Sequence, residues 1–142
     1  MEKFKFLEHT ADVFIEAYGG TLEKVFENCA LGLSKLMIEN IEDAEGSVKR
    51  VIEVEGEDLK ALLFEFLTQF LILHDSENLI FPDIKVNEIK KNGKYFLSAE
   101  AKGEEFDVNK HQGNVHVKAI TYHEMEIETE EEISRVKVLV DI

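Results

Sequence analysis

The sequence predicts an α+β fold in which a mostly antiparallel sheet packs with two main helices. Two long segments space their apolar residues as helices do, and other segments alternate apolar and polar residues as strands do. The two kinds of segment do not alternate regularly, which argues against a parallel sheet built of βαβ units. With 142 residues, 44% of them hydrophobic, and one proline, residues 1–142 are expected to form a single domain with a substantial core.

The first helix is expected to follow a strand at residues 12–18. That strand alternates, so one face carries Val13, Ile15 and Ala17. The other face carries Asp12, Phe14, Glu16 and Tyr18. Thr21 comes after a glycine pair and is a suitable N-cap. Apolar residues then recur at the three-and-four spacing of one helical face over residues 22–37.

The second helix is expected to begin near Glu57-Asp58 and to end at about His74. Its apolar residues form one stripe, but Phe64 and other apolar residues lie outside that stripe. A helix that is apolar around most of its circumference is usually covered on several sides. We therefore expect this helix to be central.

The rest of the chain is expected to form strands and loops. The strands comprise residues 48–54, 84–89 and 95–101, a strand that begins at residue 115 and passes Tyr122, and a last strand that ends at Asp141. Asn92-Gly93, between the second and third of these, is a common hairpin turn. Residues 124–132 are expected to be a solvated strand end and turn, and residues 75–78 and 109–114 mobile loops.

Charge restricts the classes of partner. Thirty acidic residues against sixteen basic ones give a formal net charge of −14, and no run of Lys or Arg exceeds two residues. Because nucleic-acid affinity comes largely from cationic groups on the phosphate backbone, direct binding of RNA or DNA is disfavoured. A basic protein partner or a metal ion is more compatible with this charge, although the charge also keeps a protein soluble.

Targeting and catalytic motifs are absent from the sequence. One cysteine allows no internal disulfide, the N-terminus lacks a signal-like apolar stretch, and the apolar stretch 59–73 contains charged residues. We expect a cytoplasmic protein without a membrane segment. No dinucleotide, P-loop, zinc-protease or nucleophile-elbow motif occurs, so no catalytic residue is assigned and the protein is not expected to be an enzyme.

The two ends of the chain carry the candidate metal site. Asp12 lies at the start of one strand and Asp141 at the end of another, followed only by Ile142. If these strands are neighbours, two carboxylates and a terminal carboxylate meet, and oxygen ligands of this kind suit a hard divalent cation. Exposed acidic residues are common, so each carboxylate taken alone is better explained as a solvated side chain.

A second polar set lies on the strand around residue 120. Lys118, Ile120 and Tyr122 are expected on one face, with Thr121 and His123 on the other. Lys, Tyr and His interleaved near a carboxylate pair are typical of a binding rim, but a paired surface strand explains the pattern equally well.

Four segments together resemble the archease family, in order and over essentially the whole chain. They are His9-Thr10-Ala11-Asp12-Val13, Leu62-Leu63-Phe64-Glu65-Phe66-Leu67, Val117-Lys118-Ala119-Ile120-Thr121-Tyr122-His123 and Asp141-Ile142. The resemblance implies a non-catalytic cofactor of the GTP-dependent tRNA-splicing RNA ligase, which joins a 2′,3′-cyclic or 3′-phosphate end to a 5′-hydroxyl. Such a cofactor promotes guanylylation of the ligase and permits multiple turnover.

The resemblance also implies site residues. A divalent cation, calcium in family members and with magnesium or manganese as alternatives, would be bound by Asp12, Asp141 and a main-chain oxygen of Ile142. Candidate contacts to the partner are His9, Lys118, Tyr122 and His123. Two other functions stay open: a chaperone-like modulator of a tRNA cytosine-5 methyltransferase, and a metal-dependent phosphoester hydrolase.

Overall fold

The computed structural model describes residues 2–9, 12–130 and 133–142, which form seven strands, two α-helices and one 3₁₀ helix. The strands are β1 (Phe4–His9), β2 (Asp12–Gly19), β3 (Val48–Gly56), β4 (Leu79–Asn92), β5 (Lys94–Glu105), β6 (Ala119–Thr129) and β7 (Ser134–Asp141). The helices are α1 (Leu22–Met37), η1 (Ile41–Asp43) and α2 (Leu59–Glu77).

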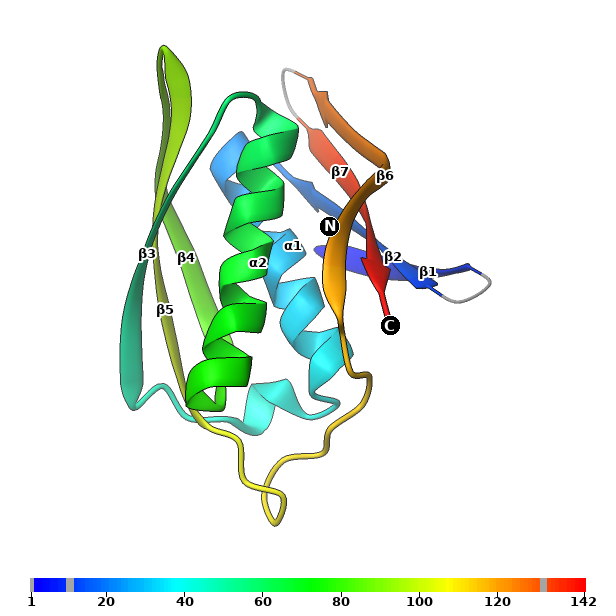
Figure 1. The fold of residues 1–142 in the computed structure, drawn as a ribbon, viewed down its shortest axis with the longest axis vertical. Helices are drawn as coiled ribbons and strands as arrows, with labels where there is room; N and C mark the ends of the chain where they lie inside the picture. The colour runs from blue at the N-terminus through cyan, green and yellow to red at the C-terminus, as the bar shows by residue number, and fades with distance from the viewer. Residues whose placement is uncertain (1, 10–11, 131–132) are drawn as a thin grey trace.

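The elements are arranged in three layers (Figure 1). A four-stranded sheet of order β1-β2-β7-β6 and a three-stranded sheet of order β3-β5-β4 lie on either side of the two α-helices. All strand pairs are antiparallel, and each helix contacts strands of both sheets. The predicted α+β class is confirmed, with the strands divided between two sheets.

The central position of the helices explains their composition. On α2, Leu62, Leu63, Phe66 and Leu67 are fully buried, and Phe64 packs against the same core from a partly buried position. A helix with a sheet on each side must be apolar on two faces, which is why apolar residues surround most of α2. Among the described residues, no helix is both long enough and apolar enough to cross a membrane.

Local capping sets the helix ends. The Thr21 hydroxyl accepts the Lys24 N–H at 3.1 Å at the start of α1, and the Asp58 carboxylate accepts the Ala61 N–H at 2.8 Å at the start of α2. Asn78, with a left-handed φ of 58°, ends α2. The prediction of a loop at residues 75–78 is therefore wrong for 75–77, which are helical.

The strand predictions need two corrections near the C-terminal part of the chain. Residues 115–118 are not a strand, since β6 begins at Ala119. Residues 124–129, predicted as a strand end and turn, continue β6, and Met125 within them is buried. Residues 131–132 of the predicted turn lie outside the described residues.

A buried carboxylate joins α1 to the three-stranded sheet. Glu27 is 8% exposed, and its Oε1 accepts the Val86 N–H at 3.0 Å while its Oε2 lies 2.7 Å from Lys24 Nζ. Val86 lies where the register of β4 against β5 shifts, between Val86 and Glu88. Glu27 thus provides an acceptor for a main-chain donor at a break in the ladder.

We expect the Glu27→Ala substitution to lower the free energy of unfolding by about 2 kcal/mol, because it leaves the buried Val86 N–H without its acceptor. Glu27→Gln keeps an amide oxygen for that donor and should cost clearly less. Urea unfolding of the two variants at neutral pH measures the difference. Equal losses would show that the ion pair with Lys24, rather than the hydrogen bond, carries the effect.

Candidate functional site

The four-stranded sheet brings Asp12 and Asp141 directly opposite each other. In the antiparallel pairing of β2 with β7, Asp12 is in register with Asp141, and Val13 with Val140. Directly opposite residues of adjacent strands project from the same face, with their β-carbons about 5 Å apart. The prediction that these two strands are neighbours is confirmed.

The same register row extends across the whole sheet. On β1, His9 is opposite Asp12, and on β6, Ala119 is opposite Asp141. We call these four residues, His9, Asp12, Asp141 and Ala119, the terminal row. Four strands thus contribute to one corner of the molecule, where the end of β7 lies beside the start of β2 (Figure 1).

Part of this corner lies outside the described residues. That applies to Thr10 and Ala11 between β1 and β2, and to the side chain of His9. Lys118 precedes β6, is exposed, and donates its main-chain N–H to the main-chain oxygen of Asp141 at 2.8 Å. This hydrogen bond places Lys118 next to the terminal row.

The carboxylates face away from the helices. Val13 and Val140, one residue along each strand, are in the core, so Asp12 and Asp141 project from the outer face, where both are partly exposed. Next to them on that face, Phe14 and Leu139 are opposite each other and buried.

Glutamates form ion pairs with the basic side chains on the outer face of β7. Arg135 nitrogens lie 3.3 Å from Glu16, 2.9 Å from Glu126 and 3.0 Å from Glu128. These carboxylates, Glu128 foremost, raise the pKa of the Arg135 guanidinium. Because Phe14 and Leu139 separate this charged network from the terminal row, the two opposed aspartates form a distinct region of negative charge.

The donor set at this corner suits a hard cation. Like charges directly opposite in a sheet are destabilising, and a divalent ion between two carboxylates removes that cost. Among the described residues, no three His, Cys, Asp or Glu side chains are grouped to hold a metal ion. The two aspartates would therefore need main-chain oxygens, and Ile142, whose side chain packs against the core, has one next to Asp141.

The second predicted set is divided between two surfaces. Ile120 is buried, and Tyr122 stacks on Phe64 of α2, with ring centroids 4.4 Å apart and planes at 9°. Both therefore lie on one face of the strand, as predicted, but this face is turned toward the helices. The prediction that Tyr122 belongs to a rim beside the carboxylates is wrong, since Asp12 and Asp141 project from the outer face. His123 is exposed, with Nε2 3.7 Å from Glu124.

An irregularity in β6, which the sequence analysis missed, positions Tyr122. The register of β6 against β7 runs to Thr121 and resumes at Glu126, so four residues of β6 oppose the single residue Val138. Within this bulge Glu124 has a φ of 54°, the left-handed region. The only signal in the sequence is the loss of apolar alternation after Tyr122.

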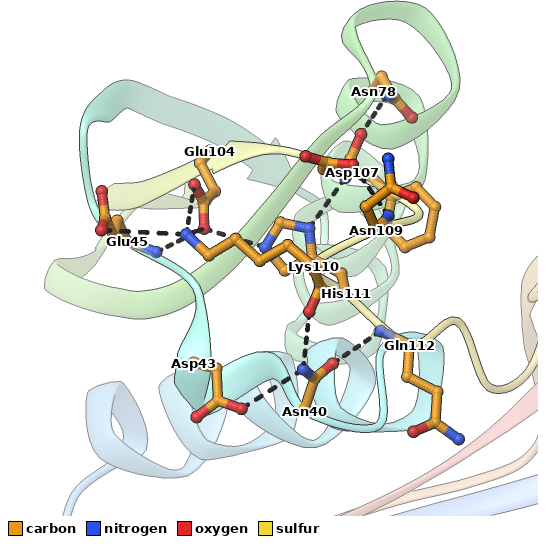
Figure 2. A network of polar contacts seen from close by, with 11 residues as sticks. Asn40, Asp43, Glu45, Asn78, Glu104, Asp107, Asn109, Lys110, His111 and Gln112 are labelled. Atoms are coloured by element: carbon orange, nitrogen blue, oxygen red, sulfur yellow. Dashed lines mark hydrogen bonds and ion pairs between the residues drawn. The ribbon is translucent and has the colours of Figure 1, made fainter.

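A polar network, also missed, anchors the segment that leads to Lys118 (Figure 2). His111 is buried; its Nδ1 accepts the Asp107 N–H at 2.9 Å, which leaves Nε2 as the donor to Glu104 at 2.9 Å. Glu104 also binds Lys110 Nζ at 2.8 Å and accepts the Glu45 N–H at 2.7 Å. These contacts hold residues 107–111 against Glu104 of β5, which also binds Glu45, ahead of β3.

The chain is similar to known proteins over its whole length. The profile of the Archease protein family (MTH1598/TM1083) matches residues 4–142. Protein archease of Pyrococcus furiosus is 50% identical over 128 residues, which are 90% of this chain and 89% of that protein. The solution structure of Methanobacterium thermoautotrophicum protein 1598 is 34% identical and has a TM-score of 0.84, with 100% of both chains covered.

A more distant structure has the same fold. It is a crystal structure from Thermotoga maritima, described as "an archease, possible chaperone". It has a TM-score of 0.58 at 21% identity and covers 100% of this chain and 99% of that one. At this identity the match supports the fold alone.

Proposed function

Because this chain belongs to the archease family, we propose that it is a non-catalytic activator of the GTP-dependent tRNA-splicing RNA ligase. It would promote guanylylation of the ligase and allow multiple turnover through a divalent-metal site. The observation that supports this proposal most directly is the register of β2 and β7, which sets Asp12 opposite Asp141 at one corner of the sheet.

The proposed roles of the residues follow from their positions. The carboxylates of Asp12 and Asp141 and the main-chain oxygen of Ile142 would hold the cation. When bound, a divalent cation supplies charge neutralisation for the phosphates of a nucleotide. Lys118, fixed by its hydrogen bond to Asp141, would present an exposed amine beside the same corner.

The charge of the chain is consistent with a basic partner. A protein of net charge −14 is attracted to an enzyme that carries a positive surface for RNA, and it does not compete for that RNA. The positive field of such a surface would attract the corner that carries the two carboxylates. It would therefore favour encounters in which this corner faces the enzyme.

The test compares Asp12→Asn and Asp141→Asn with a control, Asp83→Asn, an exposed aspartate on β4 of the other sheet. We expect both site variants to keep the fold and to stimulate ligase guanylylation at least about tenfold less, the size of effect typical of lost transition-state charge stabilisation. The control should stimulate as the wild type does. Undiminished stimulation by both site variants would refute the proposal.

Calorimetry with calcium, magnesium and manganese tests the metal site independently of the ligase. Binding should be present in the wild type and the control and lost in both site variants. The second candidate is a chaperone-like modulator of a tRNA methyltransferase; the Thermotoga maritima protein is itself described as a possible chaperone. Suppression of methyltransferase aggregation that persists in the site variants, without ligase stimulation by the wild type, would favour it.

A further inference from the structure

We infer that Tyr122 and the carboxylates at the start of α2 form a docking surface for an arginine-rich segment of a partner protein. We call this surface, made of Phe64, Tyr122, Glu57, Asp58 and Glu65, the α2–β6 surface. It lies on the side of β6 opposite to the terminal row, so the inference goes beyond the metal site of the proposed function and does not require it.

Tyr122 forms an exposed aromatic platform that is supported from one side. Tyr122 is 51% exposed although one face of its ring is covered by the parallel ring of Phe64, at 4.4 Å and 9°. The exposed half is therefore the opposite ring face and its edge. An aromatic ring that is fixed on one side and open on the other is a typical anchor point for a partner.

The bulge in β6 begins at Tyr122. A regular strand would pair residues 122–125 with β7, whereas here the register breaks between Thr121 and Glu126. Glu124 adopts a left-handed φ of 54°, which is unfavourable for a residue with a β-carbon. The chain thus keeps a locally strained conformation beside the exposed ring, a feature that often occurs at functional surfaces.

Negative charge gathers next to the Tyr122 ring, at the start of α2. A surface hollow of about 330 Å³ at the start of α2 is lined by the carboxylates of Glu55, Glu57, Asp58 and Glu65 and by Lys94. Lys94 Nζ lies 3.3 Å from Glu55. Within residues 2–9, 12–130 and 133–142, neither Glu57 nor Glu65 has an ion-pair partner.

The ring and the carboxylates are close enough to affect each other. Partial burial, followed by the charges of Glu65 and Asp58, raises the pKa of the Tyr122 hydroxyl above its ordinary value. Glu65 directly follows Phe64, on which Tyr122 stacks, and it lines the hollow together with Asp58, so the ring and the carboxylates belong to one surface. β6 runs alongside α2 at this point, as Figure 1 shows.

The chemistry of this surface selects arginine. A guanidinium is planar, stacks on an aromatic face, and at the same time donates two parallel hydrogen bonds to a carboxylate. Tyr122 offers the face, and Glu65, which has no ion-pair partner among the described residues, offers the acceptor. A lysine ammonium is compact and strongly hydrated, and it does not make both contacts at once. The net charge of −14 steers a basic segment toward the chain.

The experiment is an NMR titration of the full chain with a synthetic peptide of alternating glycine and arginine, compared with a glycine–lysine peptide of equal length and charge. We expect the arginine peptide to shift the resonances of Phe64, Glu65 and Tyr122 most. We expect it to bind about fivefold more weakly to Tyr122→Leu and to Glu65→Gln than to the wild type. Tyr122→Leu keeps an apolar cover on Phe64, and Glu65 is exposed, so both variants should fold.

The matched control is Glu53→Gln, an exposed carboxylate on the outer face of β3, which should bind the arginine peptide as the wild type does. Equal affinity for the two peptides, or affinity unchanged in both surface variants, would overturn the inference. Resonance shifts that occur only at the terminal row would also overturn the inference. Asp12→Asn should keep peptide binding while losing ligase stimulation, so failure of this inference and failure of the proposed function are distinguishable.

Discussion

Replacing Gly103 by alanine is expected to destabilise the fold by more than about 3 kcal/mol and to leave little folded protein. Gly103 lies on β5 opposite a bulge in β4, where Phe81 and the chain's one proline, Pro82, together oppose this single residue. The bulge pushes the main chain of β4 over Gly103. A β-carbon there would collide with the carbonyl group of Ile80 and the Cα of Phe81.

The size of this effect follows from what the new methyl group meets. All three nearest atoms belong to the main chain of β4, so no rotation of a side chain relieves the contact. The strands would have to separate, and their ladder hydrogen bonds would be lost. Thermal unfolding followed by circular dichroism measures the loss.

Gly113→Ala is the matched control for this experiment. A β-carbon at Gly113 meets only the Phe106 ring, at 3.8 Å, an ordinary van der Waals distance. Because alanine restricts the unfolded chain more than glycine does, the control should be neutral or slightly stabilising. A Gly103→Ala variant as stable as the control would show that the two strands can move apart at low cost.

The elements that were predictable from the sequence are those set by neighbouring residues. Thr21 caps the first helix as expected, and the second helix begins after Asp58, close to its predicted start. Gly93, with a φ of 76°, forms the turn predicted at Asn92-Gly93. Each feature depends on residues within a few positions of one another. The division of the strands into two sheets depends instead on contacts between remote segments, such as Glu27 with Val86, which periodicity does not record.

The candidate site was predictable to a similar extent. The proximity of Asp12 and Asp141 was predicted on the condition that their two strands are neighbours, and the register shows that they are. The contact of Tyr122 with Phe64 of α2 was not predicted, because it depends on the packing of remote segments and on a bulge that interrupts β6 after Thr121. His111 falls within residues 109–114, predicted as a mobile loop, yet it is buried against Glu104, seven residues away.

We expect Glu104→Ala to lower the free energy of unfolding by about 2 kcal/mol at neutral pH. The buried His111 side chain would lose the acceptor of its Nε2–H, and the Lys110 amine and the Glu45 N–H would lose theirs (Figure 2). Glu105→Ala, at the exposed neighbouring position, is the control and should change stability by less than about 0.5 kcal/mol.

The Glu104 carboxylate also makes the free energy of unfolding depend on pH. The hydrogen bond from Lys110, with further ones from the Glu45 N–H and His111, lowers the pKa of Glu104 from 4.5 to about 2. A carboxyl group with a lowered pKa in the folded state contributes stability above its unfolded pKa, and this contribution is lost as the pH falls through the folded pKa. The wild type should therefore lose stability between about pH 4.5 and pH 2.

Glu104→Gln isolates this charge effect, because it keeps the shape of the side chain and removes the titrating group. Its free energy of unfolding should be lower than that of the wild type at neutral pH and should fall less between pH 4.5 and pH 2. Urea titrations across that range compare the two proteins. Parallel pH profiles would mean that other carboxylates, such as those around Arg135, carry the acid sensitivity. They would also mean that the contacts holding residues 107–111 depend on hydrogen bonding and not on the charge of Glu104.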